Sequence, residues 1–141
     1  MPITTFGPGT LTMDPEGDAV SFECQVRTFT VQHAYEETQE AVRYLGDGCE
    51  SPSVQERGDS IAFDIDHALD AEGLYQYAIS NDLEPHTFQY VPNTGGTTPA
   101  QWTGTVTVTV PNVEASGRGA RLTGSVEWAG VGQFEFTPAA A

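Results

Sequence analysis

The side chains best suited to chemistry in this sequence are a histidine and the carboxylates around it. Asp64 and Asp66 precede His67, and Asp70 follows it. Asp64 and Asp66 share one face of an alternating strand pattern, which gives two oxygen donors for a weakly held cation. The spacing lacks a loop that would wrap around a metal ion. We therefore interpret the pair as a solvated acidic strand face and expect no metal site.

Catalytic and phosphate-binding motifs are missing from the sequence. It contains no GxSxG, no P-loop and no GxGxxG, and LGDG reads as a turn. The chain has 20 acidic residues, so many of them lie near one another in the sequence by chance. No pair therefore stands out as the general acid and general base of a catalytic site. We expect no catalytic residues, no cofactor and no enzymatic activity. A hydrolase that uses Asp64 or Asp66 is the least favoured alternative.

The two cysteines, Cys24 and Cys49, are expected to differ in environment. Cys24 has the parity of Val20, Phe22 and Val26, which predicts a small buried side chain. Cys49 lies in the polar stretch GDGCESPS. No CxxC spacing supports a structural zinc site. A disulfide between the two stays open, without support from the sequence.

Acidic residues dominate the charge. There are 20 Asp and Glu against five arginines and no lysine, a formal net charge of −15. Such a chain repels phosphate, which disfavours ordinary nucleic-acid binding. Solubility or a salt-adapted host explains the charge most simply, and a surface that repels an anion is the sharper alternative. The apolar runs are too short to cross a membrane, and no signal-peptide pattern begins the chain, so we expect a cytoplasmic protein without a membrane partner.

Period-2 patterns dominate the chain and predict one mainly β domain over residues 1–141. The clearest is WTGTVTVTVP, in which valines occupy one parity and uncharged threonines the other. Edge strands usually carry charge, so this neutral strand is unusual. The expected fold is an antiparallel β-sandwich or barrel. The expected segments are an N-terminal arm at 1–17, strands at 18–33, 60–67, 86–91, 102–111, 122–128 and 131–136, and a tail at 137–141.

One short flanking helix is expected at about residues 70–82. Asp70 is its predicted N-cap, and Leu74, Ile79 and either Tyr77 or Ala78 form its apolar stripe. The predicted aromatic core is Phe22, Phe63, Phe88, Trp102, Trp128, Phe134 and Phe136.

Residues 18–33 change parity midway, which indicates a bulge or a change of environment. The next segment, 34–59, is acidic and irregular, with Tyr35, Val42, Tyr44 and Leu45 as its large apolar side chains. A connection of this length in a small domain is usually functional or partly disordered. We expect a long loop or a hairpin extension here.

The region from Ile61 to Phe136 resembles the major tail (tail tube) proteins of long-tailed phages, especially phages of actinobacteria. The resemblance rests on LDAEGLYQYAISNDLEPHTFQYVPNTGG, WTGTVTVTVP and LTGSVEWAGVGQFEF, and it extends loosely over 18–137. The residues that match the family pattern are Gly73, Leu74, Tyr77, Asn81, Pro85, Phe88, Tyr90, Val91, Pro92, Asn93, Gly104, Thr105, Val106, Glu135 and Phe136.

The resemblance implies a structural virion protein of a siphophage. Such proteins form hexameric rings that stack into a tube, and long strands of each subunit join a continuous barrel around an acidic lumen. Genomic DNA passes through this lumen without specific binding during ejection. The implied partners are further copies of the chain, a tape measure protein, and tail terminator and tip proteins. The implied location is the virion tail, after assembly in the host cytoplasm.

Site residues follow from placing the acidic segments in such a tube. The expected lumen-facing acids are Glu23, Glu36, Glu37, Glu40, Asp64 and Asp66. The expected inter-ring loop contains Asp47, Glu50 and Arg57. The alternative function is a β-sandwich binding, decoration or adhesion domain of a virion, which would share the fold without stacking into tubes.

Overall fold

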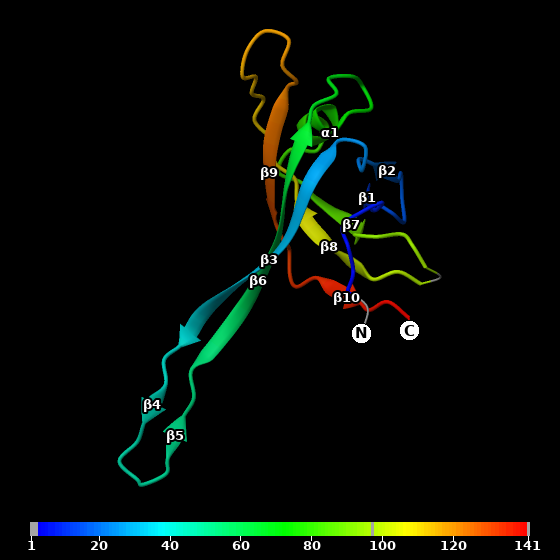
Figure 1. Ribbon diagram of the computed structural model, residues 1–141. Helices are drawn as coiled ribbons and strands as arrows, with labels where there is room; N and C mark the ends of the chain where they lie inside the picture. Colours follow the sequence, from blue (N-terminus) through cyan, green and yellow to red (C-terminus); the bar gives the residue numbers. More distant parts are fainter. Residues whose placement is uncertain (1–2, 97, 141) are drawn as a thin grey trace.

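The computed structural model describes residues 3–96 and 98–140. Sheet A has five antiparallel strands in the order β10-β8-β7-β1-β2, and sheet B has three in the order β3-β6-β9 (Figure 1). The strands of sheet A are β1 (Thr10–Met13), β2 (Val20–Ser21), β7 (Pro85–Val91), β8 (Gln101–Thr107) and β10 (Glu135–Thr137). The strands of sheet B are β3 (Val26–Gln39), β6 (Val54–Asp66) and β9 (Thr123–Ala129).

The acidic middle segment is a long hairpin. The β3–β6 ladder runs from Val26 opposite Ile65 to Gln39 opposite Val54. Beyond it, β4 (Val42–Arg43) pairs with β5 (Glu50–Ser51). We call residues 34–58 the hairpin arm and residues 42–51 its tip. The arm projects away from the two packed sheets (Figure 1).

The core lies between the two sheets. The alternation in β6 places Ile61, Phe63 and Ile65 inward, each at most 3% exposed. The Phe63 ring meets Trp128 edge to face at 5.4 Å. Burying each of these side chains stabilises the fold by about 1.5–3 kcal/mol. The predicted class, an antiparallel β-sandwich with a short helix and a hairpin extension, is therefore confirmed.

The neutral strand expected at residues 102–111 lies in the interior of sheet A as β8. β8 is flanked by β7 on one side and β10 on the other. Thr105 stands opposite Thr87, and Val106 and Val108 are completely buried. Interior pairing removes the need for protective charge on this strand. The strand ends at Thr107, before the predicted end at 111.

The helix α1 (Leu74–Ser80) is shorter than predicted and is capped differently. Its N-cap is Gly73, without a side-chain cap, whereas Asp70 Oδ1 accepts a hydrogen bond from the Glu72 N–H at 3.1 Å. Leu74 and Ala78 are fully buried, but Ile79 is 48% exposed, so its predicted place on the buried stripe is wrong. With the helix starting at Leu74, the i and i+4 positions face the core, and position i+5 points away from it.

The predicted strand 18–33 is interrupted. The backbone turns between β2 and β3, where the Gln25 N–H donates to the Phe22 carbonyl, and a register shift follows between Val26 and Thr28. Cys24 lies in this turn and is exposed, so the predicted burial is wrong. Phe136 is also wrong as a core residue, because β10 is the edge strand of sheet A and leaves the ring 53% exposed.

The two ends of the chain fall partly within the described residues. Residues 3–9 of the predicted arm precede β1, whereas residues 1–2 lie outside the described residues. The predicted tail at 137–141 overlaps the end of β10, and residue 141 is likewise outside.

Candidate functional site

The outward face of sheet B is the most distinctive surface of the chain. In the ladder, Thr30 stands opposite Ala62, which in turn stands opposite Glu127. Small, neutral or acidic side chains fill the outward positions, and none of these positions in the paired stretch is an arginine. We call this surface the outer face of sheet B. Its residues are Thr28, Thr30, Gln32, Ala34, Glu36, Glu56, Gly58, Ser60, Ala62, Asp64, Ser125, Glu127 and Ala129.

Asp64 lies on the middle strand of this face and is held by its neighbours on both sides. Its Oδ2 accepts a hydrogen bond from Thr28 Oγ1 at 3.1 Å, and its Oδ1 accepts one from Ser125 Oγ at 3.0 Å. The three residues lie on β3, β6 and β9 and line a shallow hollow of about 380 Å³. The carboxylate is thus held in place by two neutral hydroxyl donors on the flanking strands.

Asp66 differs from Asp64 because arginines neutralise it. Its carboxylate lies 2.8 Å from Arg27 Nε and 3.3 Å from Arg121 Nη1. His67 does not join these acids, since its Nε2 lies 2.8 Å from the Asn112 carbonyl oxygen. The cation site considered for Asp64 and Asp66 therefore has no geometry in its favour. Within residues 3–96 and 98–140, no group of three or more His, Cys, Asp or Glu side chains is arranged to hold a metal ion.

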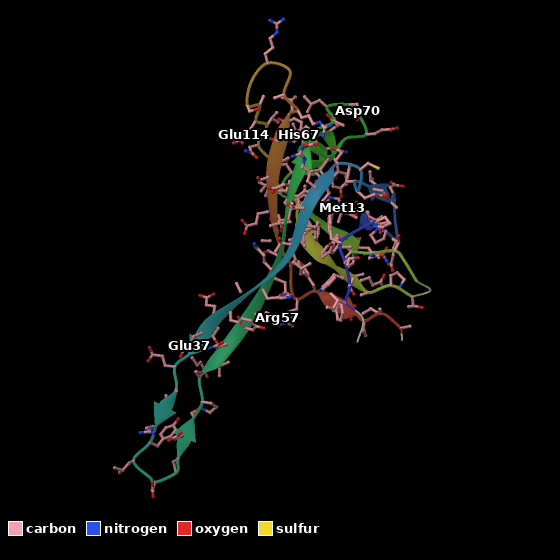
Figure 2. The ribbon with its side chains drawn as sticks, in the orientation of Figure 1. Met13, Glu37, Arg57, His67, Asp70 and Glu114 are labelled. Carbon is pink, nitrogen blue, oxygen red and sulfur yellow. The ribbon has the colours of Figure 1, made fainter. Side chains whose placement is uncertain are left out.

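The acids of the hairpin arm point in different directions. Glu36 stands opposite Glu56 on the outer face of sheet B, a like-charged pair that destabilises the arm slightly. Glu37 has the opposite parity, and Glu40 follows the end of β3. Figure 2 shows Glu37 well along the arm. Three of the predicted lumen-facing acids therefore lie on one face of sheet B: Glu36, Asp64 and, at the end of the ladder, Asp66.

The remaining predicted site residues do not lie together. Glu23 lies in the turn before β3, beside a hollow between the two sheets. Glu50 and Asp47 lie at the tip, where Arg43 Nε approaches Glu50 Oε1 at 3.2 Å. Arg57 lies at the other end of the arm, close to the packed sheets (Figure 2).

Arg57 belongs to a buried polar node at the root of the arm. The side chain of Asp59 is fully buried and lies 2.6 Å from His33 Nδ1 and 3.0 Å from Arg57 Nε. Its other oxygen accepts a hydrogen bond from the Phe134 N–H at 2.8 Å. Burial alone raises the pKa of Asp59, but the hydrogen bonds from His33 and Phe134 and the charge of Arg57 outweigh it, so the net pKa is lowered. This node joins the arm to the loop before β10.

A second polar cluster links β1 to the helix and β7. Asp14 accepts a hydrogen bond from the Tyr77 hydroxyl at 2.9 Å and lies 3.0 Å from His86 Nδ1. Burial, together with the Asp14 carboxylate, raises the pKa of Tyr77 far above its usual range. The tyrosine therefore stays protonated and donates to Asp14 as a structural tie.

Sequence reasoning missed Asp59 and Glu127, although both had a signal. Asp59 has the parity of Ile61 and Phe63, so the pattern already placed an acid among inward-facing residues. Glu127 alternates with Val126 and Trp128, which predicts an outward acid on β9.

Comparisons with known proteins point to one class of structure. No protein-family model matches the chain. No curated protein matches it either. Among solved structures, the chain is similar to one described as the tail of an empty GTA particle, computed with helical refinement and C6 symmetry. The TM-score is 0.63 at 16% sequence identity, over 91% of this chain and 94% of that one. This likeness shows a shared fold.

The helical content is small. Among residues 3–96 and 98–140, no helix is both long and apolar enough to cross a membrane.

Proposed function

We propose that this chain is the subunit of a phage-type tail tube. Six copies form a ring, rings stack into a tube, and the outer face of sheet B lines the channel through which DNA leaves the particle. The observation that carries the proposal is the outer face of sheet B, whose paired positions from Glu36 to Asp64 are all acidic or neutral, with arginines only where the ladder ends at Asp66. The likeness to a chain of a C6-symmetric tail supports it at the level of the fold.

An acidic, smooth wall suits the passage of DNA. A cationic wall would release counterions at each phosphate contact and so hold the DNA in place. Here Asp64, Glu36 and Glu127 repel phosphate, while the neutral side chains between them offer few strong contacts. Arg27 and Arg121 lie at the end of this face, where the Asp66 carboxylate pairs with both and offsets their charge.

The edges of sheet B suit ring closure. Within the described residues, β3 and β9 are the outer strands of this sheet. The outer side of β3 has no ladder in the monomer, whereas the start of β9 is covered, since Thr123 bridges Glu114 and the Ser125 N–H donates to Asn112 Oδ1. Residues 28–35 of β3 carry no formal charge apart from a histidine, so this long edge is poorly protected against pairing. In the proposed ring, β3 of one copy pairs beside β9 of the next, and closure of the ring removes the free edges.

The chain is not proposed to be an enzyme. Its partners in the proposal are copies of itself, a tape measure protein inside the tube, and terminator and tip proteins at its ends. Its place is the tail of a siphophage-like virion, assembled in the host cytoplasm.

Negative-stain electron microscopy of the purified protein, with and without isolated tail tips as seeds, tests the proposal. Stacked rings with a central channel are expected. Particles that remain single subunits at high concentration in the presence of seeds would overturn it.

A virion binding module is the second candidate, favoured by one observation. Trp102 and Phe136 pack at 4.9 Å beside an open hollow of about 410 Å³ that His33 and Arg57 also line. Exposed aromatic groups of this kind often contact partners. Discrete monomers that bind another virion protein through Phe136 would favour this candidate over the tube.

A further inference from the structure

The outer edge of β9, on the side away from β6, is already occupied at both ends in the single chain. At its start, Thr123 and Glu114 exchange two backbone hydrogen bonds, each 2.8 Å long. At its end, Gly130 bridges Val106 of β8. In the proposed ring, β3 of the next copy needs the same edge. One of the two covers therefore has to give way before a long ladder can form there.

The cover at the start of β9 is a short segment, residues 112–114, which we call the strap. Asn112 Oδ1 accepts a hydrogen bond from the Ser125 N–H at 2.9 Å, and the Asn112 carbonyl oxygen lies 2.8 Å from His67 Nε2. Glu114 and His67 lie at the end of sheet B away from the hairpin arm (Figure 2). Together with the two Glu114 bonds, these contacts place the strap where a further strand of sheet B would lie.

The strap is the cover that can be displaced at low cost. Val106 is completely buried, so releasing the bridge at the other end of β9 would open the core. The three strap residues are all exposed, so their displacement uncovers little apolar surface. An incoming strand also replaces their hydrogen bonds to Thr123 and Ser125 with bonds of the same kind.

The chain on either side of the strap allows it to move. Before the strap, Pro111 is buried and Trp128 Nε1 donates to the Thr109 carbonyl at 3.0 Å, so the backbone is held at this point. After the strap, residues 115–121 are exposed and provide slack. The strap can therefore swing about Pro111 while β9 keeps its place beside β6.

We propose that the strap controls ring formation: it covers the start of β9 in the free subunit, and β3 of the next copy displaces it as the ring closes. The inference rests on the proposed tube and concerns the lateral contact within one ring. An open strand edge is a template for uncontrolled pairing. A displaceable cover keeps the subunit single until a ring or a seed presents β3 in the correct position.

The strand β3 suits this exchange. Its residues 28–35 carry no formal charge apart from a histidine, and its outer side has no ladder within the described residues. It is 14 residues long, so it replaces the strap at Thr123 and Ser125 and extends past Glu127. The incoming strand therefore forms more hydrogen bonds to β9 than the strap gives up.

Hydrogen exchange of single amides tests the displacement directly. Free subunits and seeded tubes of the full chain are exchanged for equal times, quenched and read at residue resolution by mass spectrometry. The Glu114 N–H is expected to exchange at least tenfold faster in tubes, because β3 has taken its acceptor on Thr123. The Thr123 and Ser125 N–H groups stay protected in both states. The Val108 N–H, which donates to the Glu84 carbonyl, is the control.

A Glu114 N–H that is as protected in tubes as in free subunits would overturn the inference and leave the proposed tube intact. A parent chain that stays monomeric with tail-tip seeds would instead overturn the proposed function, and this inference with it.

A disulfide across the strap tests whether displacement is required. Glu114 and Thr123 form a hydrogen-bonded antiparallel pair. The Cα atoms of such a pair lie ~5.5 Å apart, which is within the range of about 4.4–6.8 Å for a disulfide. The variant is Glu114→Cys/Thr123→Cys in a Cys24→Ser/Cys49→Ser background. Diamide, which accepts the two electrons and two protons of the thiols, closes the bond, and dithiothreitol reopens it.

With tail-tip seeds, the reduced variant is expected to form tubes, and oxidation is expected to lower the yield of tubes at least tenfold. The cysteine-free background treated with diamide is the control and should assemble like the parent. Equal assembly of the oxidised and reduced forms would overturn the inference.

A variant that loosens the strap decides the matter if the cysteine pair itself prevents assembly. Asn112→Ala removes the acceptor of the Ser125 N–H. Seeded tube growth, followed by light scattering, is expected to become about fivefold faster, the factor that one neutral hydrogen bond contributes. Ser116→Ala, in the exposed loop after the strap, is the control and should keep the parent rate. An unchanged or slower rate for Asn112→Ala would overturn the inference.

Discussion

Removing the Asp59 carboxylate is expected to destabilise the fold through the root of the hairpin arm. The fully buried side chain lies 2.6 Å from His33 Nδ1, accepts a hydrogen bond from the Phe134 N–H at 2.8 Å, and forms an ion pair with Arg57 Nε at 3.0 Å. Breaking one partner of a buried ion pair costs about 3–5 kcal/mol. His33 and Arg57 keep side-chain exposures of 40% and 32%, so water replaces part of what they lose. The Phe134 N–H has no such replacement, and an orphaned buried donor costs about 1–3 kcal/mol.

The expected cost for Asp59→Ala is therefore about 3 kcal/mol, at the lower end of the range for a buried pair. For Asp59→Asn, which keeps an acceptor oxygen for Phe134, we expect about 2 kcal/mol, the range for a lost hydrogen bond to a charged group. Urea unfolding followed by tryptophan fluorescence measures both. Asp82→Ala, at an exposed acid, is the control and should stay within about 0.5 kcal/mol of the parent. A loss below about 1 kcal/mol for Asp59→Ala would refute the reasoning.

The pH dependence of the parent chain checks the same node. The pKa of Asp59 is lowered in the fold, so its stabilising contribution is present above the unfolded pKa of about 3.9 and is lost as pH falls through the folded value. The Asp59→Asn variant should lack this part of the acid-induced loss. Parallel curves for the two chains below about pH 4 would show that Asp59 contributes no such linkage.

Three further outcomes are expected. Gly104→Ala should cost about 1–3 kcal/mol in urea unfolding, because the added Cβ would lie 2.4 Å from the Phe134 ring, whereas Gly117→Ala meets no atom within 4 Å and should be nearly neutral. Glu127→Arg tubes should retain double-stranded DNA in sedimentation at low salt and release it as salt rises. The control tubes, Glu16→Arg, should not retain DNA. Equal retention by the two variants would argue against a channel lined by β9. Tube formation followed by light scattering should increase with added salt or divalent cations, because screening at ~0.1 M acts beyond ~10 Å, and a decline with salt would contradict this.

The strands could be predicted where one face of the sheet is buried. The alternation of Ile61, Phe63 and Ile65 sets the inward face of β6, and tertiary packing agrees with it. The same alternation failed for Cys24, because a turn between β2 and β3 breaks the strand without a glycine or proline to mark it. Periodicity reports which face a residue takes only while the strand continues.

The site was harder to predict because it depends on pairing between distant segments. The outer face of sheet B forms when β6 lies between β3 and β9, and sequence alone does not specify that register. Asp64 could be placed on an outward face, but its hydrogen bonds to Thr28 and Ser125 follow from the ladder. The Asp59 node likewise needs Phe134, 75 residues away in the chain.

The hairpin arm shows a third limit. Its acids looked alike in the sequence, yet the ladder sends Glu36 and Glu37 to opposite faces. A bulge between Glu37 and Gln39 then shifts the register toward the tip. Without that register, the direction of each acid in this segment could not be assigned.

Helical reconstruction of assembled tubes by electron cryomicroscopy tests the central claim most directly, since it places each sheet relative to the channel. The account predicts six copies per ring, with Asp64 and Glu127 on the channel wall and sheet A outside. A reconstruction in which sheet A lines the channel, or in which the outer face of sheet B is buried against another subunit, would contradict it.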